Sequence, residues 1–226
     1  MVGKRPLVIT PPQINKYYAL DLSPDKSMVR FLLESGIQVF AVSWRNPTAA
    51  HRDWGLDTYV AALDEAVDAA REISGSEDVS MMGSCSGGIT ATAYFSTLGS
   101  AADKKIKNLV LAVCLLDPNA AEETTLGCLM TPETMRLAKE SSKLRGIVDG
   151  HDLARMFAWM RPNDLIWPYV VNVYLKGQSP FPFDLLYWNG DGTNLPGKMV
   201  TQYLRNLCQK NALAGEGFEI LGHTLH

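Results

Sequence analysis

Residues 79–88 place a cysteine in a turn so tight that few folds accommodate it. The apolar run 79–82 is typical of a short strand, and Gly83-Ser84-Cys85-Ser86-Gly87 follows it directly. A strand that ends in Gly-x-nucleophile-x-Gly and opens into a helix is the sequence form of a nucleophile elbow, in which the outer positions must be small. The motif therefore predicts that Cys85 is a nucleophile, and the alternative is a buried, inert cysteine.

The first half of the chain alternates apolar runs with amphipathic segments. Apolar residues recur at helical spacing between Leu56 and Ile73. Strands that alternate with helices favour parallel pairing, and continuous apolar runs favour a sheet covered on both faces. We expect an α/β fold with a parallel-dominated sheet and with Cys85 at the carboxyl end of its strand. The expected strands are 7–10, 38–43, 79–82 and 109–116, and the expected helices are 27–34, 56–73 and 89–98.

The pattern changes after Asp117-Pro118. The region up to Gly197 contains helical patches, several prolines and clusters of aromatic residues, but no clear strand. We interpret it as a mostly helical cap above the sheet. The expected division is a core at 1–119, a helical cap at 120–200, and a segment at 201–226 that returns toward the core.

Composition excludes several classes of protein. Of the 226 residues, 46% are apolar and 20% charged, which is typical of a globular domain. The net charge of −3 gives no electrostatic reason to expect nucleic acid as a partner. No apolar stretch approaches the roughly 20 residues of a transmembrane helix, and the first five residues lack the apolar core of a signal peptide. Four cysteines without a CxxC pair predict neither a metal site nor a disulfide framework.

Five motifs, in one order along the chain, resemble those of the polyhydroxyalkanoate synthases. This family comprises acyltransferases that polymerise (R)-3-hydroxyacyl-CoA. A lone Gly-x-Cys-x-Gly is weak evidence, whereas the ordered set covers nearly the whole chain. The motifs are PPQINKYY at 11–18, SWRNP at 43–47, GSCSGG at 83–88, FAWMRPND at 157–164 and WNGDGTNLP at 188–196.

The resemblance implies an α/β-hydrolase fold with a cap, and a covalent acyl thioester on Cys85. It implies (R)-3-hydroxyacyl-CoA and the growing polyester chain as partners, a homodimer, and a cytoplasmic location at the surface of polyester granules. No cofactor is implied, because the coenzyme A thioester is the substrate. The segments at 11–13 and 161–167 look closer to the medium-chain type.

The chain also departs from the family pattern. Synthases carry a further N-terminal region and, after the cap, two segments that bear the catalytic Asp and the catalytic His. We expect both residues, and the C-terminal strands of the sheet, to lie beyond His226. Gly222-His223 resembles the histidine turn but precedes any catalytic-acid strand, so we do not expect it to be the base. We therefore expect this chain alone not to turn over hydroxyacyl-CoA, and to undergo at most one slow acylation of Cys85.

An oxyanion hole needs two backbone N–H groups aimed at the developing negative charge. In this architecture one N–H belongs to the residue after the nucleophile, here Ser86, at the start of a helix. The other comes from the loop after the first strand, and Gln13 is the best candidate. The alternative for Pro11-Pro12 is a stiff connection without a catalytic role.

The remaining polar candidates favour structural roles. Asp117 follows a strand, where some α/β hydrolases carry their acid, but a turn before Pro118 is the stronger interpretation. We expect His51 to be solvated, and His151-Asp152 to start a helix that the aspartate caps. Asp191 is expected to order its loop.

Three further cysteines and three arginines complete the candidates. We expect Cys114 to be core within its apolar strand, and Cys128 and Cys208 to be packing residues. The phosphates of coenzyme A need cationic partners, for which Arg45, Arg52 and Arg161 are candidates, but no clustered basic patch selects one. The aromatic residues of the cap fit either simple core packing or an acyl tunnel.

Two other functions remain open on the sequence. One is hydrolysis by a cysteine-type α/β hydrolase, such as an esterase or a dienelactone hydrolase, which would release free hydroxy acid instead of polymer. The other is a non-catalytic role, in which Cys85 would react with iodoacetamide no faster than Cys128 or Cys208.

Overall fold

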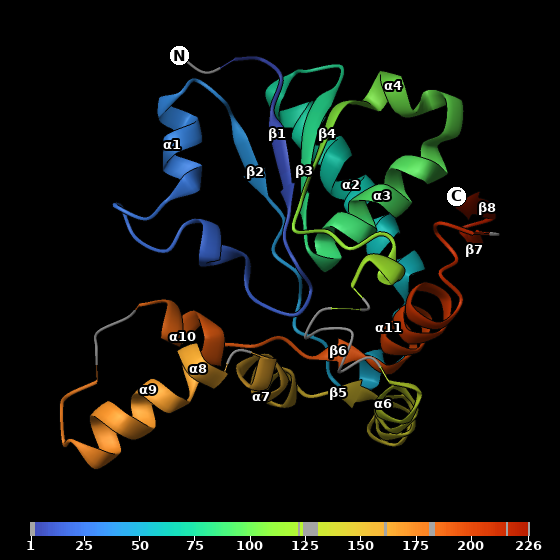
Figure 1. Ribbon diagram of the computed structural model, residues 1–226. Helices are drawn as coiled ribbons and strands as arrows, with labels where there is room; N and C mark the ends of the chain where they lie inside the picture. The colour runs from blue at the N-terminus through green and yellow to red at the C-terminus, as the bar shows by residue number, and fades with distance from the viewer. Residues whose placement is uncertain are drawn as a thin grey trace.

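A four-stranded parallel sheet forms the centre of the protein (Figure 1). The computed structural model describes residues 3–121, 123, 131–160, 162–180, 184–215 and 217–225. The strand order is β2-β1-β3-β4, and each neighbouring pair is parallel, as the alternating pattern predicts. The strands are β1 (Leu7–Thr10), β2 (Val39–Ala41), β3 (Val79–Ser84) and β4 (Ile106–Ala112).

Helices lie on both sides of this sheet (Figure 1). Helix α1 (Met28–Glu34) lies beside β2, and Ser27 caps it by accepting a hydrogen bond from the N–H of Arg30. Helices α2 (Leu56–Ser74) and α3 (Ser86–Leu98) pack together on the opposite side. Short elements complete this half: η1 (Tyr17–Leu20), η2 (Ala49–His51), η3 (Gly99–Ala101), α4 (Ala102–Lys105) and η4 (Pro118–Ala121).

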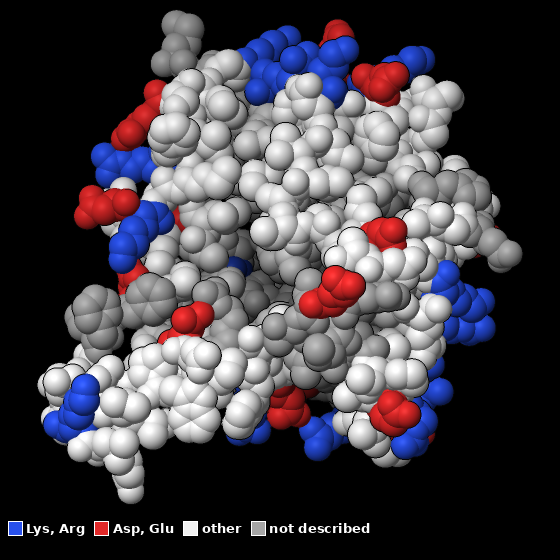
Figure 2. Space-filling view, viewed as in Figure 1, with Lys and Arg blue, Asp and Glu red and all other residues white. Residues whose placement is uncertain are grey.

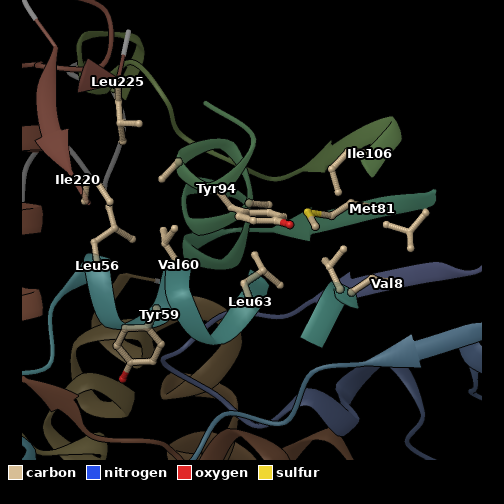
Figure 3. Packing of buried hydrophobic residues seen from close by; sticks show 14 of the residues in the cluster. Val8, Leu56, Tyr59, Val60, Leu63, Met81, Tyr94, Ile106, Ile220 and Leu225 are labelled. Atoms are coloured by element: carbon tan, nitrogen blue, oxygen red, sulfur yellow. The ribbon is translucent and has the colours of Figure 1, made fainter. Parts of the chain in front are cut away.

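The hydrophobic core lies between the sheet and the α2–α3 pair (Figure 3). The helical periodicity of α2 places one apolar face inward, where Leu63 and Val67 are fully buried. Tyr94 of α3 packs close to Met81 of β3 in the same cluster. The spacing of apolar residues therefore predicted the core-facing side of α2 correctly as far as Val67, whereas Ile73, at its end, is 70% exposed.

The cap lies below the carboxyl ends of the strands in Figure 1. It is mostly helical, as expected, but it also holds a short antiparallel pair, β5 (Ile147–Val148) with β6 (Leu195–Pro196). The prediction that this region has no strand was wrong, because two-residue strands are too short to show any periodicity. The cap helices are α6 (Pro132–Arg145), α7 (Gly150–Met160), α8 (Pro162–Leu165), α9 (Trp167–Tyr169), the π-helical turn Val170–Leu175 and α10 (Leu185–Gly190).

The last segment differs from a simple return toward the sheet. Helix α11 (Gly197–Gln202) continues as a π-helical stretch at Tyr203–Gln209. A hairpin of β7 (Phe218–Ile220) and β8 (His223–Leu225) follows, and its buried residues Ile220 and Leu225 join the core cluster beside α2 and α3 (Figure 3). The segment thus adds to the core as a helix and a hairpin.

Strand β4 corrects two expectations. It ends at Ala112 instead of residue 116, because Val113 adopts a left-handed backbone conformation (φ 46°) that leaves the sheet. It is also not covered on both faces: Val110 and Leu111 are exposed, and Val113 is 87% exposed. The physical reason is that β4 forms an edge of the described sheet. Figure 2, in the same view as Figure 1, shows few charged side chains in the middle of the molecule.

Among the described residues, no helix combines the length and apolarity that crossing a membrane requires.

Candidate active site

Cys85 lies between β3 and α3 in a strained turn. Its φ of 50° and ψ of −126° are rarely adopted by residues other than glycine. The turn is fixed on both sides: the N–H of Cys85 donates to the carbonyl of Ala112 (3.0 Å), and its carbonyl accepts from the N–H of Gly88 (3.0 Å). The structure therefore has the elbow geometry that the sequence motif predicts.

The glycines of the motif are required by close backbone packing. A Cβ atom at Gly83 would lie 2.6 Å from the Cα of Gly88. A Cβ atom at Gly87 would overlap the carbonyl oxygens of Thr10 and Pro11. The short distance from Gly87 to Thr10 and Pro11 shows that the elbow and the loop after β1 are in direct contact.

The side chain of Cys85 faces a pocket of about 440 Å³. The pocket lies between the core and the cap, and its surface is mainly apolar. The loop after β1 contributes Pro12 and Ile14, whereas the cap contributes Phe157, Met160, Leu165 and Trp188. Two aromatic residues of the cap thus line the pocket, while others, including Trp159, Tyr174 and Tyr187, are exposed.

Burial raises the pKa of the Cys85 thiol, and the N–H of Ser86 offsets part of this effect by stabilising the thiolate. The helix N-terminus therefore does not bring the pKa below its ordinary value. At neutral pH the thiol form dominates, so rapid nucleophilic attack from this site requires a general base.

Gln13 and Ser86, the two predicted oxyanion residues, lie next to each other. Gln13 is 1% exposed, and its backbone N–H donates to the hydroxyl oxygen of Ser86 (3.2 Å). Its side-chain amide donates to Thr90 Oγ1 (2.8 Å), which anchors the loop to α3. The Ser86 hydroxyl thus holds the acceptor position on the Gln13 N–H, and it would have to rotate away before an oxyanion could bind there.

Two tryptophan indoles fix the loop that contains Gln13. Trp44 Nε1 donates to the carbonyl of Pro11 (2.8 Å), and Trp188 Nε1 donates to the carbonyl of Lys16 (2.7 Å). The N–H of Thr193 donates to the carbonyl of Ile14 between them (2.8 Å). Sequence reasoning did not predict these contacts. The common membership of the three motifs in one family was the only clue that they meet.

Asp191 orders its loop through a contact across the chain. It accepts a hydrogen bond from the hydroxyl of Tyr18 (2.8 Å), and desolvation together with this bond raises the pKa of Tyr18 to about 12. Asn194 lies three residues later, donates to the carbonyl of Pro47 (3.0 Å) and accepts from the N–H of Gly150 (2.9 Å). The segment 188–196 therefore joins the cap to both loops of the core.

The other polar candidates lie in structural contacts. Asp117 accepts from the N–H of Asn119 and from Asn211 Nδ2, which is the predicted turn. His51 is half-buried, not solvated: its Nδ1 lies 2.9 Å from the N–H of Thr48 and its ring packs on Trp54.

His151 and His223 are exposed. His151 lies in the first turn of α7, whose start is capped by Asp149 and not by Asp152, because Asp149 accepts from the N–H of His151 (2.8 Å). His223 lies in β8. Among the described residues that line the pocket at Cys85 there is no histidine, aspartate or glutamate. The location of the acid and the base stays a prediction.

The remaining cysteines and arginines have mixed outcomes. Cys114 lies beyond the end of β4, half-buried against Gly88, so its placement within a core strand was wrong. Cys208 is half-buried in the stretch 203–209. Arg45 and Arg52 are exposed, and Arg52 lines a surface cavity with Lys143 and Lys198. Cys128 and Arg161 lie outside the described residues.

Comparison with known proteins agrees with this geometry. The model of the alpha/beta hydrolase fold family matches residues 6–214. The chain belongs to this family. A solved structure of a protein named as a lipase, from Sulfolobus solfataricus, has the same fold, with a TM-score of 0.54 at 20% identity over 95% of this chain and 69% of that one.

Curated relatives confirm the resemblance that the motifs indicated. Poly(3-hydroxyalkanoate) polymerase 1 of Ectopseudomonas oleovorans is 50% identical over 91% of this α/β-hydrolase chain. A polymerase subunit of Cupriavidus necator is 40% identical over 96% of it. The chain spans 37% of the length of each of these two relatives.

Proposed function

We propose that this chain is part of a polyhydroxyalkanoate synthase, an acyltransferase that forms polyester from (R)-3-hydroxyacyl-CoA and releases coenzyme A. The observation that carries the proposal is Cys85 in a strained elbow, opening into an apolar pocket that the cap covers. Relatives named as poly(3-hydroxyalkanoate) polymerases support it across nearly the whole chain.

The proposed reaction has two acyl transfers. In the first, the Cys85 thiolate attacks the thioester carbonyl, and the backbone N–H groups of Ser86 and Gln13 stabilise the oxyanion. The tetrahedral intermediate collapses, breaks the bond to the sulfur of coenzyme A, and leaves an acyl thioester on Cys85. In the second, a hydroxyl attacks this thioester and loses its proton to a base. The bond between the acyl carbon and the Cys85 sulfur breaks, which releases the Cys85 thiolate and leaves an ester.

The energetics favour a thiol nucleophile for this substrate. The first transfer exchanges one thioester for another and is close to isoenergetic, whereas the second converts a thioester into a more stable ester. Water would hydrolyse the same intermediate, so a polymerase needs a site that excludes water. The apolar walls supplied by Phe157, Met160 and Leu165 support polymerisation over the alternative, a cysteine-type esterase.

The products distinguish these two functions. The chain, and the same chain extended to the length of its relatives, would be incubated with (R)-3-hydroxyacyl-CoA while coenzyme A release and products are followed. Coenzyme A release with growing ester oligomers supports the synthase. Free hydroxy acid without oligomers supports the hydrolase, and no acylation of Cys85 in either form contradicts both.

The proposal also includes a homodimer at the surface of polyester granules and a medium-chain preference.

A further inference from the structure

A second apolar cavity lies beside the pocket at Cys85. It measures about 210 Å³ and is enclosed by helices α6, α7 and α11 and by the stretch 203–209. Its lining includes Leu153, Val200, Leu204 and Cys208, and it presents essentially no polar surface. Protein interiors rarely leave voids larger than a water molecule, so an apolar space of this size suggests a ligand.

The second cavity shares walls with the active site. Ser86 and Gln13, the proposed oxyanion residues, both line it, and Ile14 lines both cavities. Helix α7 covers both, since Met156 lines the second cavity while the next residue, Phe157, lines the pocket at Cys85. The two spaces are therefore neighbours under one helix, with Ile14 between them.

We propose that the second cavity binds the alkyl side chain of the acyl group held on Cys85, with Ile14 as the residue that the chain must pass. This inference rests on the proposed function. An apolar cavity of about 150 Å³ stays dry and binds a six-carbon ring, so the space here suffices for an aliphatic tail of about six carbons. A short acyl group would end in the pocket at Cys85 and leave the second cavity empty.

Cys208 provides a built-in reporter of occupancy, because its side chain lines the second cavity and not the pocket at Cys85. N-ethylmaleimide labelling of Cys208 in the unaltered chain would be followed by peptide mass, with 1-octanol or 1-butanol present. The octyl chain should slow labelling about tenfold and the butyl chain hardly at all, since each buried methylene adds to binding. Equal labelling rates with the two alcohols would overturn the proposal.

A second measurement ties the cavity to the reaction. The rates of Cys85 acylation by (R)-3-hydroxydecanoyl-CoA and by (R)-3-hydroxybutyryl-CoA would be compared in Ala138→Leu, which fills the cavity from α6. The decanoyl-to-butyryl ratio should fall about tenfold. The matched control, Ala69→Leu on the exposed side of α2, should keep the ratio of the unaltered chain.

The outcomes separate this inference from the proposed function. An unchanged ratio in Ala138→Leu, with Cys85 acylated by both thioesters, overturns the cavity assignment and leaves the function intact. Acylation of Cys85 by neither thioester contradicts the function, and the alcohol experiment then decides on its own whether the cavity takes an aliphatic chain.

Discussion

The helix pair α2–α3 and the cap helices α7–α10 are held against the rest of the protein in different ways. Helices α2 and α3 bury a continuous apolar face against β3, and Leu63 at its centre has no exposed surface. Helices α7–α10 instead expose large apolar residues, with Tyr174 of the adjoining turn 84% exposed. Cys85 is thus supported by core packing, whereas directed hydrogen bonds join the cap to the core: Trp188 and Thr193 donate to backbone carbonyls, and Asp191 accepts from the hydroxyl of Tyr18.

This difference has a consequence for the surface. The exposed faces of β4 and of the cap present apolar side chains with few charges between them in the view of Figure 2. Exposed apolar patches favour association. We expect the chain in isolation to aggregate more readily than its net charge would suggest.

The largest effect should come from the core side of the comparison. Leu63→Ala removes a fully buried side chain and should lower the free energy of unfolding by about 2–5 kcal/mol. Tyr174→Ala, on the cap side, should change it by less than about 0.5 kcal/mol. Urea denaturation followed by circular dichroism measures both, and equal losses would remove the distinction between the two regions.

Two glycines allow the comparison to be made at the backbone. Gly87→Ala forces a methyl group against the carbonyl oxygens of Thr10 and Pro11, and should cost about 1–3 kcal/mol and displace the loop of Gln13. Gly190→Ala, at the end of α10, meets no atom within 4 Å and should be nearly neutral. Thermal unfolding and Cys85 acylation rates measure the pair. A stable, fully reactive Gly87→Ala variant would contradict the described contact between elbow and loop.

The burial of Cys85 should appear in its pH dependence. Because burial raises the pKa of this thiol, the alkylation rate by iodoacetamide should level off at a higher pH than it does for an ordinary thiol, whose pKa is about 8.5. Glutathione under the same conditions serves as the reference. A rate for Cys85 that levels off near pH 8 would show a depressed pKa and an activating partner close to the thiol.

The link between the two regions should have a moderate effect. Trp188→Phe keeps most of the apolar wall but removes the indole donor to the carbonyl of Lys16. The free energy of unfolding should fall by about 1 kcal/mol, and the free-energy barrier to acylation of Cys85 should rise by a similar amount. Trp167→Phe, at an exposed position of α9, is the control. Identical behaviour of the two variants would mean that the hydrogen bond does not hold the cap.

The smallest effect should come from an ion pair on the core side. Lys105 pairs with Asp64 and with Asp68 at 2.9 Å. Desolvation raises the pKa of Asp68, but the hydrogen bonds from Lys105 and Arg71 outweigh it, so the pKa lies below its ordinary value. The stabilisation is therefore present above about pH 4 and is lost as the pH falls through the lowered pKa. Lys105→Met should lower the free energy of unfolding by about 0.5 kcal/mol at neutral pH and by little in acid. The control variant Lys104→Met should show no such dependence on pH.

The sequence could predict the features that depend on local patterns, but not those that depend on contacts between distant segments. Strands, helices and the elbow follow from local periodicity and from glycines in a tight turn, so β1, α2, the start of β3 and the position of Cys85 in its turn were predicted correctly. The end of β4 depends on the left-handed Val113, and the β5–β6 pair on a contact between distant segments, neither of which leaves a local pattern. The hydrogen bonds of Trp44 and Trp188 join residues 33 and 172 positions apart, which only the folded chain brings together.

The central claim is that Cys85 carries the acyl group. The chain would be incubated with (R)-3-hydroxyacyl-CoA, quenched in acid, digested and analysed by mass spectrometry, in parallel with Cys85→Ala. The account predicts one acyl unit on the peptide containing Cys85, removable by hydroxylamine as a thioester, and none on any peptide of the alanine variant. An acyl group on Cys114 or Cys208 with Cys85 unmodified, or equal acylation of the alanine variant, would contradict it.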